Sequence, residues 1–295
     1  MRFNMNFVFY LHDEPSIEQF EKKLLRFKKK YNIISFEDFS NAISNGIKLK
    51  NSCLLTVDDG WRSTYDVIFP VIKKHKVPIT IFVSPKVCKE GINFWYYLLR
   101  YCNSDMLYSF LIEDGYYQKS AEKYPLNLLM KGLSINDINK LIEKCLNNIQ
   151  SFPKRAFINE IELLEMYNSG LVEVGAHTMN HPILANESDE ISKYEILKSV
   201  EELSLILKAK VRAFAYPNGL SGLDFTKREY TYLREAGISY AFSTNPGSIS
   251  SNMDFFNVPR IGSERRLAFG ELGCYLPSSA NQTGLRNKII QMKKL

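Results

Sequence analysis

Residues 52–60 carry the sequence SCLLTVDDG, in which an apolar run ends in two adjacent aspartates, Asp58 and Asp59, and a glycine. The run 52–57 is typical of a strand that is buried on both faces. Carboxylates at the end of such a strand are costly unless they pair with a cation or a metal. Because successive residues of an extended chain face opposite sides, we expect one aspartate to bind a cation and the other to stay free as a base. An acidic turn, or a cap for a helix at Thr64, is the alternative.

Outward from this stretch, strand-like and helix-like segments alternate along the chain. Strands are predicted at 7–11, 33–34, 52–57, 79–83, 171–174, 211–216, 238–243 and 258–261, and helices at 16–30, 35–45, 64–74, 159–169, 189–207 and 226–236. Repeated strand–helix units predict a mostly parallel sheet with helices outside it. Seven or so parallel strands favour a closed or nearly closed barrel over an open sheet. In such a barrel the active site lies at the carboxyl ends of the strands.

The stretch from about 90 to 155 breaks this alternation. It is rich in aromatic residues, among them Trp95 and Tyr96, and contains one clear helix at 134–150. We interpret it as a helical, aromatic insertion in one domain that spans 1–295 and ends in a basic tail at about 278–295. The aromatic rings could stack on sugars, although we expect most of them to pack in a core.

Composition excludes several classes of protein. With 45% hydrophobic residues among 295, the chain is too apolar for a disordered protein. It carries no glycine-rich phosphate-binding loop. The net charge of +6 comes from 38 basic and 32 acidic residues, but the basic residues are spread out, and the densest cluster, at 26–30, ends a predicted helix. We therefore expect no nucleic-acid partner, and leave open a weak contact of the basic tail with an anionic membrane surface.

The expected compartment is the cytoplasm. The apolar run at 7–11 is shorter than the roughly 7–15 apolar residues of a secretory signal and far shorter than the ~20 of a transmembrane segment, so neither is predicted. The five cysteines are scattered and form no CxxC pair, which predicts buried thiols and neither a zinc ribbon nor a disulfide framework.

A second group of polar residues follows the predicted strand at 171–174. His177 and His181 have the spacing that brings two imidazoles to one metal, and the chain holds only four histidines. Pro182 disfavours helical geometry at His181, so a loop is expected there. Together with Asp59, the two histidines would leave an open coordination position, as catalytic metal sites do, and such a site suits several first-row metals. The alternative is a pair of structural histidines.

Three motifs at these strand ends resemble a known family. TVDDG at 56–60, GAHTMNH at 175–181 and FAYPNG at 214–219 are similar to the first three motifs of the polysaccharide deacetylases, the NodB-homology domains of carbohydrate esterase family 4. The resemblance covers roughly residues 5–90 and 158–262. It implies a distorted barrel and the hydrolysis of an N-acetyl, or sometimes O-acetyl, group on a sugar.

The resemblance also implies roles for single residues. Asp58 corresponds to the general base, and Asp59, His177 and His181 correspond to the ligands of one divalent metal, for which we expect zinc while other first-row metals remain open. A backbone N–H near Asn218 corresponds to a donor for the oxyanion.

Candidate substrate-binding residues are Asn218 and Tyr216 of the third motif, and Trp61 beside the aspartates.

The chain departs from the family pattern at three points. Ala215 stands where the third motif has an arginine that steadies the base, and we expect Arg260 to supply this cation, with a plain surface arginine as the alternative. Asn218 replaces the usual tyrosine. No histidine follows residue 181, so the C-terminal histidine that acts as the general acid in the common arrangement of the family is missing. In the permuted subgroup that resembles poly-N-acetylglucosamine deacetylases, this acid lies on the first strand, where the chain has His12. The position of His75, inside the predicted helix at 64–74 or directly after it, does not indicate a catalytic role.

The leading functional hypothesis is therefore a metal-dependent carbohydrate N-deacetylase, a hydrolase that acts on the C–N bond of an N-acetylated sugar or glycan. A catalytically silent, glycan-binding member of the same fold is the main alternative. A phosphoesterase with two metals would need a second set of acidic ligands, and we see none in the sequence. The stoichiometry of bound metal distinguishes the one-metal from the two-metal hypothesis.

Overall fold

The computed structural model describes residues 5–147, 154–250 and 252–263, together with 284, 286, 288 and 289. Their strands form one sheet with the order β7-β6-β5-β4-β3-β1-β8, in which every pairing is parallel, while β2 pairs with β3. The strands are β1 (Phe7–Leu11), β2 (Asn32–Ile34), β3 (Ser52–Val57), β4 (Ile79–Val83), β5 (Val172–Ala176), β6 (Ala213–Ala215), β7 (Tyr240–Phe242) and β8 (Ile261–Gly262).

The last strand brings the two ends of this sheet together. β8 pairs with β1, and just before it Val258 forms a parallel bridge with Phe242 of β7. The Ser243 amide donates to the Val258 carbonyl at 2.9 Å, and the Ser263 amide donates to the Tyr10 carbonyl at 3.0 Å. The segment before and through β8 thus contacts both end strands, and the distorted (β/α) barrel expected from the sequence is confirmed.

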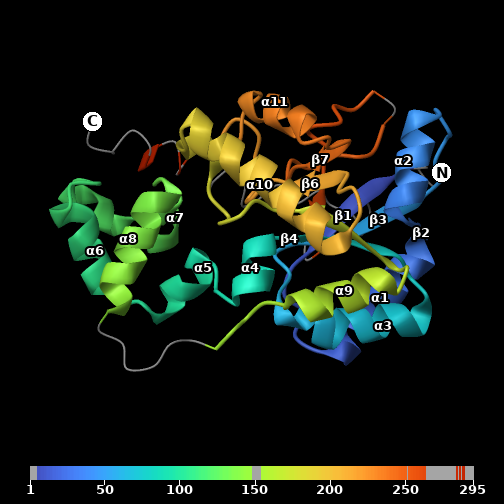
Figure 1. Cartoon of the computed structure of the whole chain (residues 1–295), viewed down its shortest axis with the longest axis horizontal. Coiled ribbons are helices and arrows are strands. Elements are labelled where there is room, and N and C mark those ends of the chain that lie inside the picture. The colour runs from blue at the N-terminus through green and yellow to red at the C-terminus, as the bar shows by residue number, and fades with distance from the viewer. Residues whose placement is uncertain are drawn as a thin grey trace.

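Helices cover the outside of the sheet (Figure 1). They are α1 (Ile17–Lys30), α2 (Phe36–Ser44), α3 (Phe69–His75), α4 (Pro85–Glu90), α9 (Glu160–Asn168), α10 (Asp189–Leu207) and α11 (Arg228–Glu235). Ser16 and Ser35 cap α1 and α2 as predicted. The predicted helix 64–74 is wrong in one respect, because its first turn, Thr64–Ile68, is a π-helix. Pro70 lacks the amide that would complete regular α-helical bonding at this junction.

The pleat of the strands separates the residues inside the barrel from those beneath the helices. Alternate residues of β1, β3, β4 and β6, such as Val8, Leu54, Phe82 and Ala215, belong to one apolar cluster, and their neighbours in sequence belong to another that includes the inner faces of α1 and α10. With a period of two, the first set continues beyond β3 to Asp58. Side chains of this set at the carboxyl ends of the strands therefore point into the barrel mouth.

The stretch between β4 and α9 has its own apolar cluster, at one end of the long axis of the molecule (Figure 1). It contains α5 (Trp95–Leu98), α6 (Ser104–Glu113), α7 (Leu126–Met130) and α8 (Ile135–Leu146). The single helix predicted here is α8, which Ser134 caps. The sequence does not predict α6, because the apolar residues of this helix lie on most of its sides and form no single apolar stripe. The end of the predicted helix, at 148–150, lies outside the described residues, as does most of the basic tail.

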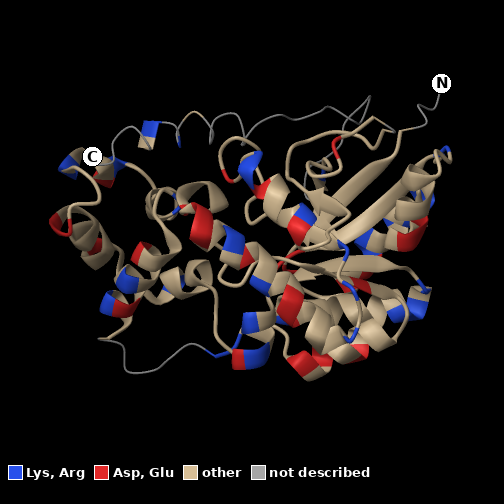
Figure 2. Ribbon diagram, turned by 45° about the horizontal axis from the view of Figure 1, so that its top comes forward, with Lys and Arg blue, Asp and Glu red and all other residues tan. Residues whose placement is uncertain are grey.

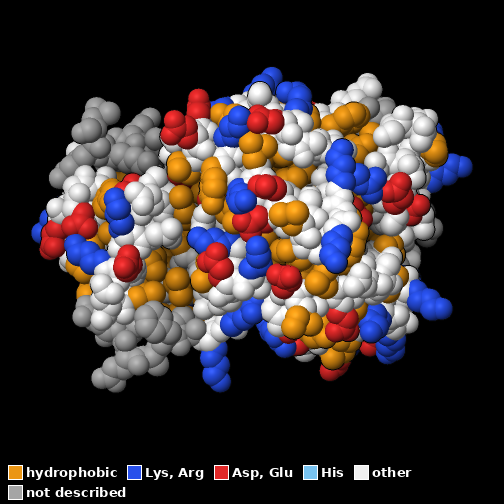
Figure 3. Space-filling model, viewed as in Figure 1, with side chains coloured by type: hydrophobic (Ala, Val, Ile, Leu, Met, Phe, Trp, Pro, Cys, Tyr) orange, Lys and Arg blue, Asp and Glu red, His pale blue; other side chains and the backbone are white. Residues whose placement is uncertain are grey.

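Charges on the outer helices are mixed in sign. Basic and acidic positions alternate along the ribbons in Figure 2, and the face drawn in Figure 3 shows both signs interspersed with hydrophobic side chains. Three lysines end α1, where they complement the helix dipole. Among the described helices, none has the length and apolar character needed to cross a bilayer.

Candidate active site

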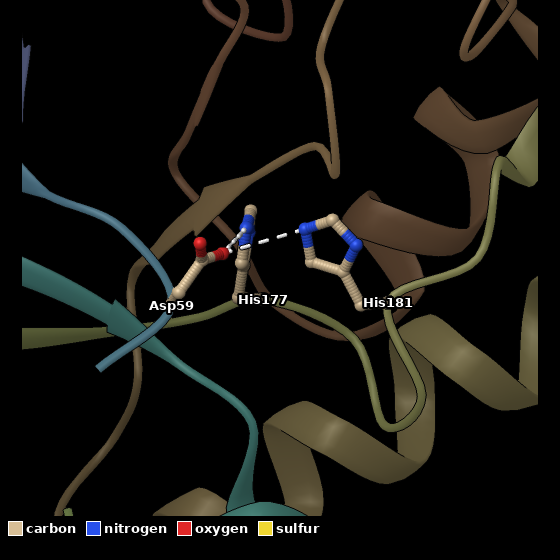
Figure 4. A group of neighbouring side chains, drawn as sticks. All are labelled: Asp59, His177 and His181. Atoms are coloured by element: carbon tan, nitrogen blue, oxygen red, sulfur yellow. Dashed lines mark ion pairs between the residues drawn. The ribbon is translucent and has the colours of Figure 1, made fainter. Parts of the chain in front are cut away.

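Two loops bring the three predicted metal ligands together. Asp59 follows β3, and His177 and His181 follow β5, two strands away in the sheet. The Asp59 Oδ1 atom lies 3.3 Å from His177 Nε2 and 3.4 Å from His181 Nε2. All three ligand atoms lie within 4.8 Å of one another, and the side chains are buried. Figure 4 shows them converging on one point.

The geometry of this triad fits a divalent metal. Ligand atoms of a four-coordinate zinc lie about 2.0–2.1 Å from the ion, and hence roughly 3.3–3.4 Å from one another. The Asp59 Oδ1 atom is buried without a hydrogen-bond partner among the described residues, so a cation would satisfy it. The His177 Nδ1–H donates to the Ala215 carbonyl at 2.7 Å, which leaves Nε2 free as a ligand. A metal would therefore be held by Asp59, His177 and His181.

Electrostatics favour the charge states that a metal site needs. Burial alone would raise the pKa of Asp59, but contact with the His177 and His181 imidazoles brings it well below its usual value. Burial lowers the pKa of His181 against the opposing pull of Asp59. A charged carboxylate and a neutral imidazole are both ready to donate electron pairs to a cation.

The backbone around the ligands is strained. Four non-glycine residues of the motifs have positive φ angles: 71° at Asp59, 62° at Thr178, 56° at His181 and 58° at Asn218. Threonine rarely adopts such a conformation because its side chain is branched at Cβ. Strain of this kind persists only where the surrounding structure holds it in place.

A buried glutamate holds the loop between the two histidines. Glu195 of α10 accepts hydrogen bonds from the backbone amides of Met179 and Asn180, at 2.8 and 2.9 Å, and from the Asn180 side chain. It is 1% exposed. Thr178 adds a further bond, since its Oγ1 accepts from the His181 amide at 3.0 Å. These contacts keep both imidazoles pointing at Asp59.

Arg260 pairs with the other aspartate. Its Nη1 lies 2.7 Å from Asp58 Oδ1 and its Nη2 lies 2.9 Å from Oδ2, and Arg260 is fully buried. Burial would raise the pKa of Asp58, but the Arg260 guanidinium, with a smaller effect of His177, brings it below its usual value. The structure thus supplies the cation that Ala215 cannot, from the last strand segment rather than from the third motif.

The predicted substrate-binding residues have different surroundings. The Trp61 Nε1–H donates to Asp59 Oδ2 at 3.1 Å, so its polar group holds a candidate ligand while its ring borders the cleft. Tyr216 lies on the helix-facing side of β6: its ring stacks on Phe225 at 3.6 Å and its hydroxyl donates to the Phe256 carbonyl. Its remaining surface borders the cleft. The Asn218 Nδ2 is buried without a partner among the described residues.

His12 and His75 lie in distinct places. His12 follows β1, is exposed, and lies at the cleft with its ring 5.5 Å from that of Tyr10. Asp58 and Asp59 line the same cleft. His75 lies on α3, where it contacts Glu21 of α1. His12 is therefore placed at the candidate site, and His75 is not.

A cleft of about 820 Å³ connects the barrel mouth to the insertion. The barrel contributes His12, both aspartates, both histidines and Asn218, and the insertion contributes Trp95, Tyr96, Leu99, Arg100, Ser104, Leu126, Asn127 and Lys131. A volume of this size is typical of sites for small ligands or a few sugar rings. The insertion therefore forms a wall of the site.

Sequence reasoning missed Glu195. The signal was present, since Glu195 lies among Ser192, Ile196 and Ser199 on the buried face of α10, where a carboxylate needs partners. The sequence indicates Trp95 only as a candidate for stacking on a sugar ring. It is 3% exposed, and its Nε1–H donates to the His181 carbonyl at 3.0 Å. No local pattern in the sequence predicts that bond.

Replacement of the proposed ligands should remove the metal. Each Asp59→Ala or His177→Ala variant loses one of three protein donors, so we expect bound divalent metal to fall from about one ion per chain to near zero after dialysis. Elemental analysis measures this. Full occupancy in both variants would show that the metal binds elsewhere.

Glu195→Ala should weaken metal binding without removing a ligand. It frees the amides of Met179 and Asn180, and loss of such supporting contacts typically costs ~10–100-fold in metal affinity. Competition with a chelator measures the affinity, and circular dichroism checks the fold. Glu202→Ala is the control, because Glu202 lies on the same helix but pairs with Lys89 on the outside. Equal affinities of the two variants would contradict the role given to Glu195.

The chain is similar to known proteins over most of its length. Chains named poly-beta-1,6-N-acetyl-D-glucosamine N-deacetylase are similar: that of Staphylococcus aureus strain MSSA476 is 20% identical over 87% of this chain and 72% of its own, and that of Staphylococcus epidermidis is 23% identical over 77% and 60%.

Two solved structures share the fold. The Streptococcus pyogenes deacetylase PplD, solved with acetate, matches 88% of this chain and 91% of its own with a TM-score of 0.57 and 19% identity. IcaB from Ammonifex degensii matches 97% of both chains, also at 0.57, with 18% identity. The model of the polysaccharide deacetylase family matches residues 45–241, well over half of the chain. The chain therefore belongs to the polysaccharide deacetylase family.

Proposed function

We propose that the chain is a metal-dependent carbohydrate N-deacetylase, which hydrolyses the N-acetyl group of a sugar to acetate and a free amine. The observation that carries this proposal is the pairing of two adjacent aspartates with two different partners. Asp59 faces His177 and His181, whereas Asp58 is bound by Arg260. One carboxylate is thus available for a cation and the other for a proton.

Asp58 is proposed as the general base. Arg260 binds both of its oxygens, which fixes the orientation of the carboxylate and keeps it charged. The same pairing makes Asp58 a weak base. A zinc ion held by the triad would supply the remaining chemistry, because it polarises the acetyl carbonyl and lowers the pKa of water toward ~7.

The proposed reaction uses two groups of the cleft. A water oxygen adds to the acetyl carbon while Asp58 takes one water proton. The C–N bond then breaks, the nitrogen takes a proton from His12, and the acetic acid that is released ionises to acetate. Loss of the proton of Asp58 to solvent and uptake of one by His12 restore both groups. The side chain of Asn218 and the ring of Trp61 border the cleft and are proposed to position the sugar.

The substrate is proposed to be an N-acetylated sugar or glycan, and the names of the Staphylococcus relatives support a polymer of N-acetylglucosamine as one candidate. Zinc is proposed as the native metal. A cytoplasmic location also stays a proposal, which cell fractionation tests. If it holds, lipid-linked, nucleotide-linked and small glycosides join the polymer as candidate substrates.

Acetate release from this panel of N-acetyl sugars tests the function, with Asp58→Asn as the reference variant. This variant keeps the metal ligands but lacks the base, so we expect full zinc content and a rate reduced by ~10²–10⁴. Glycan binding without acetate release by the wild-type protein would favour the silent, binding role. Loss of zinc in an Asp58→Asn variant whose circular dichroism spectrum matches that of the wild type would instead show that the aspartates have been assigned the wrong way round.

His12→Ala should separate amide from ester hydrolysis. An amine needs a proton to leave, and an imidazole suits this task near neutral pH, whereas the leaving group of an activated ester needs none. We expect most N-deacetylation to be lost, while hydrolysis of an acetyl ester such as 4-nitrophenyl acetate falls much less. His75→Ala is the control, because His75 lies on α3 against Glu21. Equal losses on both substrates would rule out His12 as the acid.

A further inference from the structure

The insertion contacts the metal loop directly. The Trp95 indole donates to the backbone carbonyl of His181, and the rings of Phe94 and Tyr96 lie 5.2 and 4.9 Å from the His181 ring. Tyr96 also packs 6.0 Å from Trp61, whose indole holds Asp59. Tyr96 is therefore fixed between the two loops that carry the candidate ligands.

The hydroxyl of Tyr96 has no partner in this environment. It is buried, and no described residue makes a hydrogen bond with it, although the ring borders the cleft. A phenol is protonated at neutral pH, so this hydroxyl acts as a donor. A buried donor without an acceptor is rare in native structures.

Few neighbouring acceptors remain for it once a metal is bound. Asp59 Oδ2 accepts from Trp61, and Oδ1 is the atom that a metal would take. Both oxygens of Asp58 are bound by Arg260. An acceptor supplied by the substrate would satisfy the hydroxyl. In an acetamido group the carbonyl oxygen is the only hydrogen-bond acceptor of consequence, and in the proposed reaction it must lie beside the triad.

We propose that Tyr96 is a further catalytic residue, whose hydroxyl donates a hydrogen bond to the acetyl oxygen of the substrate. The inference rests on the proposed deacetylase function and adds to it a donor from the insertion. The bond strengthens as negative charge develops on that oxygen when water adds to the carbon, and Tyr96 transfers no proton. A donor fixed in a buried site is effective here because little reorganisation is needed during the reaction.

The test compares Tyr96→Phe with Tyr97→Phe. Each removes one hydroxyl and keeps the ring, but the Tyr97 hydroxyl bonds to that of Tyr101 in an exposed position. For Tyr96→Phe we expect kcat to fall ~10²–10³-fold, the usual loss of one oxyanion donor, with KM changed by less than about threefold. Zinc content should stay at the wild-type level. Tyr97→Phe should keep the wild-type kcat.

A binding measurement gives a readout that does not depend on turnover. The probe is the methylphosphonamidate of glucosamine, whose tetrahedral phosphorus carries oxygens where the oxyanion would form. Calorimetry with the zinc-loaded protein should show at least ~10-fold weaker binding of this probe to Tyr96→Phe, with the affinity for glucosamine itself unchanged.

Three outcomes would overturn the inference. One is an unchanged kcat and probe affinity in Tyr96→Phe, while the wild-type protein releases acetate. Another is a loss of zinc in this variant, which would mean that Tyr96 only supports Asp59. The third is an equal fall of kcat in Tyr97→Phe. A wild-type protein that deacetylates no N-acetyl sugar would overturn the proposed function itself, and this inference with it.

Discussion

The buried pair of Arg260 and Asp58 organises the barrel mouth. The Arg260 guanidinium also bonds to the Thr56 hydroxyl and the Ser243 carbonyl, and it lies over the ring of Tyr10. One side chain thus contacts β1, β3 and the ends of β7 and β8. Breaking a buried pair typically costs roughly 3–5 kcal/mol, because the charge left behind has no water around it. Substitution of Arg260 would therefore disturb the fold as well as the proposed base.

Much of this architecture could be predicted because it follows local rules. Apolar runs such as Ser52–Val57 marked the strands, and serines such as Ser35 marked the starts of helices. The triad could be predicted for a similar reason, since Asp59 and His177 lie just after buried strands and His181 follows His177 at a spacing typical of metal ligands. The motifs show both where these residues lie in the sequence and which functional groups they have.

The remaining features depend on contacts between distant residues. Glu195 binds amides 15 and 16 positions away, and Trp95 binds a carbonyl 86 positions away. The sequence near either residue does not predict which backbone groups it will bind. The helix α6 and the π-helical turn at Thr64–Ile68 were missed for a different reason. The apolar residues of α6 lie on most of its sides, so its sequence shows no helical period. At Thr64–Ile68 one proline changes the hydrogen bonding of an otherwise regular helix.

The distance in sequence between Asp58 and Arg260 has a consequence for how the protein is made. The two residues are 202 positions apart, so most of the barrel must be synthesised before they can meet. Until Arg260 has been synthesised, the Asp58 carboxylate lacks the bidentate partner that orients it. The arrangement proposed for the base is therefore complete only once the segment before β8 is in place.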